Sequence, residues 1–357
     1  MRWRALAWVL LAAMGVVVGC GRREPQRPSV AEYAKRLKPL LEAAPKSVIE
    51  LDALEPEVIY PDLVIPRDTT QKEGGLFLAA PSGVVVLRDS VYITDWMNHC
   101  IMVADMEGRL DRAIGRRGQG PGEFDTPVGI AANSASLLVA EFGNRRVQVF
   151  DHALAYLGSI PAGFYLGRPA GIGASDRRFF IPGGLVQDSL LAIYEACRPY
   201  RRIGSLMPPV ASSPAYANAL RQVQAASNAA GLLAVAYSVL PYVFVFDSEA
   251  RQVATIEFRG REVRELDEKP KGVEFRGTGP TVWTRGFIWG LSVLTDGTLL
   301  VNVPKKTLIL RQGRHGYEVQ RCVHLEGTEG PWAWWYHNGK VYTSSRDGTR
   351  ILVYSLG

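Results

Sequence analysis

The sequence predicts an all-β fold: a six-bladed β-propeller of four-stranded antiparallel blades, closed by an N-terminal strand, with a short N-terminal helix. Three observations predict it. Short β-branched runs separated by turn residues fill the chain after Val48. A strand–turn–strand pattern recurs along this region, and its last copy lacks a strand. We therefore expect a single propeller over residues 46–357 rather than two ordinary domains.

The recurring pattern is two short strands joined by a turn, and it begins at Val91, Leu137, Leu233 and Val341. The second and third intervals between these starts are each about twice as long as the first. One further unit is therefore expected inside each long interval, at residues 178–204 and 287–325. Six four-stranded units around one axis make a six-bladed propeller.

Closure of the ring is expected to come from the N-terminal side. The last unit supplies strands at 331–336, 340–345 and 349–355, and the chain then stops. Residues 57–65, just before the first blade, are expected to provide the missing fourth strand. A ring closed in this way leaves no end blade with an unpaired flank, which would invite pairing with other chains.

Two segments give conflicting signals. Residues 214–226 have helical composition, but the repeat register requires an inner strand at 220–227. We follow the register, because tertiary context overrides intrinsic propensity. Residues 229–246 carry no charge over a length that could span a membrane. Gly231 and Pro241 interrupt that run, and its two halves coincide with strands of the repeat, so strands are expected there.

Residues 1–19 are interpreted as a lipoprotein signal peptide, because Arg2 and Arg4 precede an uncharged run too short to span a bilayer. The run ends in Val17-Val18-Gly19-Cys20, which resembles the lipobox of bacterial lipoproteins. This resemblance implies cleavage before Cys20 and acylation of its thiol. No acidic residue directly follows Cys20, which by the same resemblance favours the outer membrane. The alternatives are an ordinary signal peptide with an incidental cysteine, or an N-terminal anchor helix.

Residues 20–28 are expected to form a polar tether, and residues 29–45 an amphipathic helix. Ser29 and Glu32 have the spacing of a capping box, and Pro39 is expected to kink or end the helix early. We expect the apolar stripe of the helix to dock on its own domain or on the membrane rather than on a partner. The stripe comprises Val30, Tyr33, Ala34, Leu37 and Leu41.

One unit of the chain resembles an NHL repeat. The matching residues are Gly115, Gly118, Gly120, Gly122, Phe124, Pro127, Gly129, Ile130, Ala131, Val139, Asn144, Arg146, Val147 and Phe150. A second unit matches at Asp95 and Asn98, and the others match weakly. The departures are Glu141 for the usual Asp, Cys100 for the usual Arg, and Ser345 and Gly348 for the usual acid and Asn. The resemblance implies an NHL-type propeller of the kind found in bacterial six-bladed β-propeller lipoproteins.

Long connections between blades, at residues 66–80, 207–219 and 259–284, are expected on the same face as the turns between the second and third strands of each blade. Long loops on a rigid scaffold are where recognition is usually placed. The binding candidates on this face are Trp96, Arg116, Arg117 and Arg145. Trp332 and Trp334, on the innermost strand of the last blade, are further candidates, although packing between blades is the favoured use of these rings.

Several polar residues on the same face are interpreted as structural. Asp95, Asn98, Glu141 and Asn144 are short carboxylates and amides that are expected to cap their own turns. The glycine-rich segment at 118–122 is expected to be a turn rather than a phosphate cradle, because Pro127 and a β-pattern follow it instead of a helix.

The five histidines show no metal-ligand spacing, so no metal or cofactor is expected. Cys100, Cys197 and Cys322 would remain after export; one pair could bridge, but three small buried side chains are favoured. Loss of residues 1–19 removes two arginines and lowers the formal charge from +6 to +4. That charge is weak evidence for a nucleic-acid partner, and none is expected.

These features predict a monomeric, lipid-anchored protein of the bacterial cell envelope, in the outer membrane and facing the periplasm. Its predicted function is binding or scaffolding, with a protein, peptide or glycan partner held on the loop-rich face. Some NHL-type and related propellers are lyases or lactonases that use a metal in the central channel. The alternative is therefore a propeller hydrolase or lyase of this kind, and the fold alone does not decide between the two.

Overall fold

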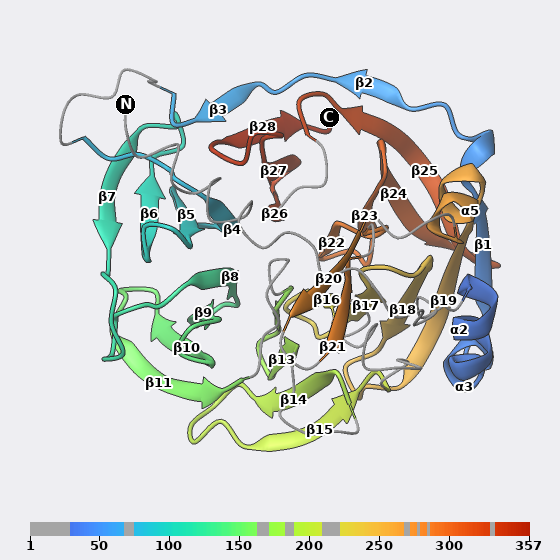
Figure 1. The fold of residues 1–357 in the computed structure, drawn as a ribbon, viewed down its shortest axis with the longest axis horizontal. Helices are drawn as coiled ribbons and strands as arrows, with labels where there is room; N and C mark the ends of the chain where they lie inside the picture. The colour runs from blue at the N-terminus through green and yellow to red at the C-terminus, as the bar shows by residue number, and fades with distance from the viewer. Residues whose placement is uncertain are drawn as a thin grey trace, which may run out of the picture.

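The computed structural model describes residues 29–67, 75–162, 171–182, 189–208, 222–267, 272–276, 279–283, 286–328 and 333–357. These residues form six antiparallel blades arranged in a ring around a central channel (Figure 1). The predicted fold class is confirmed. The expected signal peptide and tether, residues 1–28 with Cys20, lie outside the described residues.

Five of the blades are continuous in sequence, and their strands run from the channel outward in chain order. Blade 1 contains β4 (Pro81–Leu87), β5 (Ser90–Asp95), β6 (Cys100–Ala104) and β7 (Leu110–Ile114). Blade 2 contains β8 (Pro127–Ala132), β9 (Ser136–Glu141), β10 (Arg146–Asp151) and β11 (Tyr156–Pro161). Blade 3 contains β12 (Gly173–Ala174), β13 (Arg178–Pro182), β14 (Leu191–Glu195) and β15 (Arg202–Leu206).

Blade 4 contains β16 (Val223–Ser227), β17 (Leu233–Tyr237), β18 (Tyr242–Phe246) and β19 (Gln252–Arg259). Blade 5 contains β22 (Gly290–Val293), β23 (Leu299–Val303), β24 (Lys306–Gly313) and β25 (Gly316–Leu325). Blade 6 contains β26 (Trp334–His337), β27 (Lys340–Ser344) and β28 (Ile351–Ser355), and its outer strand is β3 (Leu63–Ile65) from the N-terminal side. The two units expected inside the long intervals are therefore blades 3 and 5.

The hydrophobic core lies between the blades rather than within them. The second and third strands are buried along nearly their whole length, as in β9, β17, β18 and β23, because both of their faces meet a neighbouring blade. The buried apolar residues form six clusters, one at each contact between neighbouring blades. Between blades 1 and 2, for example, Val85 and Ile101 share a cluster with Val139.

The N-terminal segment runs around the outside of blades 4, 5 and 6, as the blue ribbon in Figure 1 shows. β1 (Lys46–Glu50) pairs parallel with β19 of blade 4, and β2 (Glu57–Ile59) pairs parallel with β25 of blade 5. Only β3 pairs with β28, in antiparallel register, and completes blade 6. The segment therefore contacts three consecutive blades.

The expectation that residues 57–65 form one closing strand is therefore wrong in its bounds. Only residues 63–65 complete blade 6, and residues 57–59 pair with blade 5. The outer strands of blades 5 and 6 belong to different sheets, so one extended segment pairs with each of them over only three residues. Pro61 lies between the two pairings and has no N–H to continue a ladder.

Two short helices precede this segment. α2 (Val30–Arg36) begins with the predicted capping box between Ser29 and Glu32, which is confirmed. The expected single helix over 29–45 is interrupted at Leu37, and α3 (Lys38–Glu42) follows with Pro39 in its first turn, where a missing N–H costs nothing. Tyr33 and Leu37 are buried in the cluster between blades 3 and 4. The apolar stripe thus packs on the propeller itself.

The connection at residues 259–284, expected to be irregular, contains regular structure. It holds the helix α5 (Arg261–Asp267) and a hairpin of β20 (Gly272–Arg276) and β21 (Gly279–Trp283). The first residue of α5 contacts η1 (Leu51–Ala53) of the N-terminal segment. The Arg261 N–H donates to Asp52 Oδ1 at 2.7 Å.

The ambiguous segments are resolved in favour of the repeat register. β16 occupies Val223–Ser227, which confirms the expected inner strand; residues 209–221 lie outside the described residues. The uncharged run at 229–246 forms the antiparallel pair β17 and β18. No helix in the described part of the chain is long and apolar enough to cross a membrane.

Cys100, Cys197 and Cys322 are free thiols. Cys100 is buried, as expected, and its burial raises the pKa of the thiol to about 12. Cys197 is exposed, so the expectation of three buried side chains is wrong for this residue. It lies in a turn after β14, where its carbonyl accepts from the Tyr200 N–H, and such a surface turn offers no apolar site for the thiol.

Ile65→Ala tests closure by β3. Ile65 is fully buried between blades 6 and 1, so truncation should lower the free energy of unfolding by about 2–5 kcal/mol. The matched control is Val58→Ala in β2, where the side chain is 49% exposed and a change within about 0.5 kcal/mol is expected. Urea denaturation followed by circular dichroism measures both variants. Equal stability of the two variants would contradict closure through β3.

Candidate functional site

The turns between second and third strands share a face of the ring with the connections between blades. We call this the connection face. In blade 1, Asp95 ends β5 and accepts hydrogen bonds from the N–H groups of Ala79 and Ala80, at 2.6 and 3.1 Å. Asn98, in the following turn, donates through Nδ2 to the Phe77 carbonyl at 3.0 Å. These bonds hold the entering connection against the turn, which is the arrangement expected from the sequence.

Asp95 and Asn98 act within the fold. Asp95 is fully buried, and its carboxylate also accepts from the backbone N–H and the Nδ2 of Asn98, at 3.1 and 3.0 Å. Both carboxylate oxygens are therefore used by the protein's own donors. The expected turn-capping role of these two residues is confirmed.

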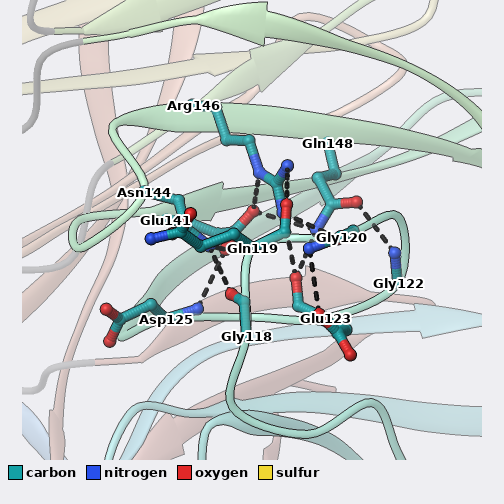
Figure 2. Close-up of polar contacts among 10 residues, drawn as sticks. All are labelled: Gly118, Gln119, Gly120, Gly122, Glu123, Asp125, Glu141, Asn144, Arg146 and Gln148. Atoms are coloured by element: carbon teal, nitrogen blue, oxygen red, sulfur yellow. Dashed lines mark hydrogen bonds and ion pairs between the residues drawn. The ribbon is translucent and has the colours of Figure 1, made fainter.

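Glu141 plays the corresponding part in blade 2, with more partners (Figure 2). Its Oε1 accepts from Arg146 Nε at 2.6 Å and from Gln148 Nε2 at 2.9 Å. Its Oε2 accepts from the Asp125 N–H at 2.9 Å and from Asn144 Nδ2 at 2.6 Å. The Glu141 side chain has no exposed surface, so four donors and one positive charge compensate a buried carboxylate.

Arg146 connects this carboxylate to the glycine-rich loop. Its guanidinium donates to the carbonyls of Gln119, Gly120 and Glu123 at 2.7, 2.9 and 3.1 Å (Figure 2). Figure 2 shows the side chains of Arg146 and Gln148 pointing toward the loop. The shape of the loop is thus set by a charged group that is itself held by Glu141.

The amides of this loop are already used by the protein. The Gly122 N–H donates to Gln148 Oε1, and the Gly120 N–H donates to Glu123 Oε2, both at 3.0 Å. The Gly120 N–H and the Arg116 guanidinium together lower the pKa of the Glu123 carboxyl below its ordinary value. A phosphate cradle needs N–H groups that point at a ligand, so the loop is a structural turn.

The structure places three of the four predicted residues as free groups on the connection face. Trp96 is 38% exposed, and Arg117 and Arg145 are exposed without an ion pair to any described residue. Arg116 is exposed as well, but it pairs with Glu123 at 2.9 Å. Trp332 lies outside the described residues.

Three exposed apolar residues beside Trp96 were not predicted as binding residues from the sequence. Leu76, Phe77 and Met97 are 41, 43 and 58% exposed. The bond from Asn98 to the Phe77 carbonyl brings the two segments together. We call Leu76, Phe77, Trp96, Met97, Arg117 and Arg145 the blade 1–2 patch. The apolar character of 76–77 was visible in the sequence, but its exposure depends on the connection lying over blade 1.

Hydrogen bonds link the turn of blade 1 that presents Trp96 to the turn of blade 2 that presents Arg145. His99, at the end of the Trp96 turn, accepts through Nδ1 from the Thr126 N–H at 3.0 Å. The Thr126 carbonyl in turn accepts from the Phe142 N–H at 3.0 Å, at the start of the turn that presents Arg145. The two turns are therefore joined through one residue.

The central channel contains a cavity of about 360 Å³. Glycine, alanine and serine from the inner strands of blades 1, 2 and 3 form much of its wall, and blades 5 and 6 contribute Trp289, Trp334, Trp335 and Tyr336. Trp334 donates through Nε1 to Ser292 Oγ at 3.0 Å and covers Gly290, where a Cβ would collide with its ring. Trp334 therefore packs blade 6 on blade 5 and also lines the cavity.

The cavity wall is uncharged: the described lining contains no aspartate, glutamate, lysine, arginine or histidine. Across the part of the chain that the structure describes, no three His, Cys, Asp or Glu side chains converge as metal ligands. The described lining therefore offers hydroxyls, amides and aromatic rings, which suit an uncharged ligand.

A family model described as "6-bladed beta-propeller" matches residues 69–165, which include blade 1 and blade 2. The chain is a six-bladed β-propeller. Among solved structures, it is similar to the RRP9 WD40 repeats, at 10% identity and a TM-score of 0.49, over 85% of this chain and 100% of that one. The corresponding values for an exported protein of Bacteroides fragilis are 8%, 0.46, 87% and 80%.

A streptogramin B lyase is also similar, at 14% identity and a TM-score of 0.45, over 79% of this propeller and 85% of the lyase chain. With TM-scores below 0.5, these likenesses carry no inference about what this propeller binds or catalyses. The bacterial lipoprotein and NHL-type resemblances stay predictions.

Arg146→Ala tests the buried ion pair beneath the connection face. Removal of the guanidinium leaves the Glu141 carboxylate buried without its charge partner, so a loss of about 3–5 kcal/mol in unfolding free energy is expected. Arg116→Ala is the control, because the Arg116 side chain is 82% exposed and its ion pair with Glu123 should contribute little. Thermal and urea unfolding compare the two. A similarly small effect of both substitutions would show that Arg146 does not hold the loop.

Proposed function

We propose that this propeller is a lipid-anchored scaffold of the bacterial cell envelope that binds a protein partner through the blade 1–2 patch. The observation that carries the proposal is the composition of this exposed surface. It combines four large apolar side chains, all at least 38% exposed, with two exposed arginines that have no ion pair to a described residue. Aromatic residues, methionine and arginine are enriched at the centres of protein interfaces.

The hydrogen bonds that hold the patch in one conformation favour binding of a partner. Asp95 and Asn98 fix the Trp96 turn, and Glu141 with its partners fixes the loop that precedes blade 2. A surface held in this way loses little conformational freedom on binding, so more of the contact energy is available as affinity. Exposed apolar side chains that lie close together on a soluble surface also typically mark an interaction site.

The lipobox-like sequence supports attachment to a membrane through Cys20. Eight residues lie between Cys20 and Ser29, so the two are at most about 30 Å apart along a fully extended chain. Arg22, Arg23 and Arg27 within this stretch would be attracted to anionic headgroups. We propose the outer membrane, facing the periplasm, as its location, because no acidic residue directly follows Cys20.

The position of α2 indicates that the lipid anchor and the blade 1–2 patch lie on different sides of the ring. α2 packs beside blade 4, which lies across the ring from blade 1 (Figure 1). A short tether ending there would hold the rim of blade 4 near the membrane. The blade 1–2 patch would then face away from the lipid, where a partner can reach it.

Cys20→Ser tests the anchor. Cells grown with an alkyne analogue of palmitate should label the wild-type protein and leave the variant unlabelled, because the acylated thiol is absent. Cys197→Ser is the matched control, since it removes an exposed thiol from the propeller and should keep the label. Gel fluorescence after coupling to a dye gives the result. Equal labelling of the Cys20→Ser variant would refute acylation at Cys20.

Trp96→Ala/Arg145→Ala tests the patch. Loss of one aromatic and one arginine from an interface should reduce capture of the partner at least tenfold, by about 1.4 kcal/mol or more. The control is Arg202→Ala/Ile203→Ala, which removes an exposed arginine and an exposed apolar residue from the outer strand of blade 3. Affinity capture from detergent-solubilised envelopes, quantified by mass spectrometry, compares both variants with the wild type. Recovery of the same proteins in equal amounts by both variants would exclude the patch.

A further inference from the structure

Gln224 is a polar side chain of the central cavity that has no hydrogen bond to the described part of the chain. Gln224, on the inner strand of blade 4, is only 8% exposed and lines the cavity. Its side-chain amide makes no hydrogen bond to any residue that the structure describes. An amide that faces a cavity without a described partner is suited to a ligand that completes its hydrogen bonds.

The neighbouring blade leaves room for this amide. A Cβ at Gly171 would collide with Gln224 Oε1, so the glycine at that position allows the amide to lie between blades 3 and 4. Ser227 Oγ and Trp335 Nε1 also lack a partner among the described residues, but both atoms are fully buried and not open to the cavity. Other polar groups of the wall are used. Asn228 donates to the Leu294 carbonyl and accepts from the Leu232 N–H, and Ser292 accepts from Trp334. Gln224 is thus the polar side chain in the described lining that is best placed to bind.

Aromatic rings form another part of the wall, on the two blades that follow blade 4. Trp289, Trp334, Trp335 and Tyr336 are each partly exposed. Two of them are held in place: Trp334 by its bond to Ser292, and Tyr336 by a hydrogen bond from the Gly339 N–H to its hydroxyl at 3.0 Å. Fixed rings of this kind offer flat apolar faces to a ligand.

The absence of charge in the described lining limits the ligand further. An ionised ligand would lose its hydration without gaining a counter-charge, which is strongly unfavourable. The ligand should therefore be neutral, with one flat apolar face for the rings and groups that can both donate to and accept from an amide. A pyranose ring has this character, because its axial C–H groups form an apolar face and its hydroxyls form a polar rim.

We infer that the central cavity binds a neutral saccharide, with Gln224 hydrogen-bonded to its hydroxyl or acetamido groups and the aromatic wall stacked on its ring. The volume of about 360 Å³ lies at the low end of the range of about 300–1,000 Å³ for ligand pockets, which limits the occupant to one or two sugar rings. The inference is independent of the blade 1–2 patch.

The test is titration of the purified full-length chain with N-acetylglucosamine, maltose, cellobiose and lactose, followed by tryptophan fluorescence and calorimetry. At least one of these sugars should bind and change the fluorescence of the wall. Gln224→Met keeps the length of the side chain and removes both polar atoms, so it should weaken that binding at least tenfold. Gln312→Met is the control, because Gln312 is exposed on β24 and away from the channel, and it should bind as the wild type does.

The Trp96→Ala/Arg145→Ala variant should keep full sugar binding, which separates the outcome from that of the proposed partner site. Three results would overturn the inference. The first is no binding of any of the four sugars to the wild type, a result that does not depend on whether Gln224→Met folds. The second is unchanged affinity in a folded Gln224→Met variant. The third is binding of indole or glucose 6-phosphate with none of the neutral sugars, which would assign an aromatic or an anionic ligand instead.

Discussion

Apolar packing between neighbouring blades is the interaction on which the rest of this structure depends. Each blade contributes to two of the six clusters, so no blade completes its own core. The ring must therefore close, and β3 closes it through three residue pairs with β28 and through Ile65, which is buried between blades 6 and 1. The wider N-terminal segment reinforces this closure, because it also pairs with the outer strands of blades 4 and 5.

Polar networks add a second level of order at the connection face. Asp95 and Glu141 occupy corresponding places, each at the end of a second strand, and each binds the chain that enters its blade. Glutamate in place of the shorter aspartate reaches Arg146 and Gln148 as well, and through them a long glycine-rich loop. These buried carboxylates accept hydrogen bonds from the protein's own donors and are not available to a partner. The exposed Trp96, Arg117 and Arg145 are the predicted groups that can contact one.

The sequence predicted those parts of the fold that depend on local pattern. Alternating runs and turns recur within each blade, so the six units, the inner strand at β16 and the capping box at Ser29 were all predictable. The parallel pairing of β1 with β19 was not, because it joins segments about 200 residues apart with no shared motif. Neither the exposure of Phe77 nor the cavity at Gln224 has a local signal. Both depend on how separate blades are placed relative to one another.

The two recognition surfaces we infer lie in different places, one on the connection face and the other inside the channel. The blade 1–2 patch is built on turns between second and third strands, on the connection face. The cavity lining instead extends to Asn133, Asn228 and Thr295, which follow the inner strands β8, β16 and β22 in turns on the other face. A ligand entering from that side would not meet a partner on the patch. Because the ring between them is closed and tightly packed, the two sites are expected to bind independently rather than to compete.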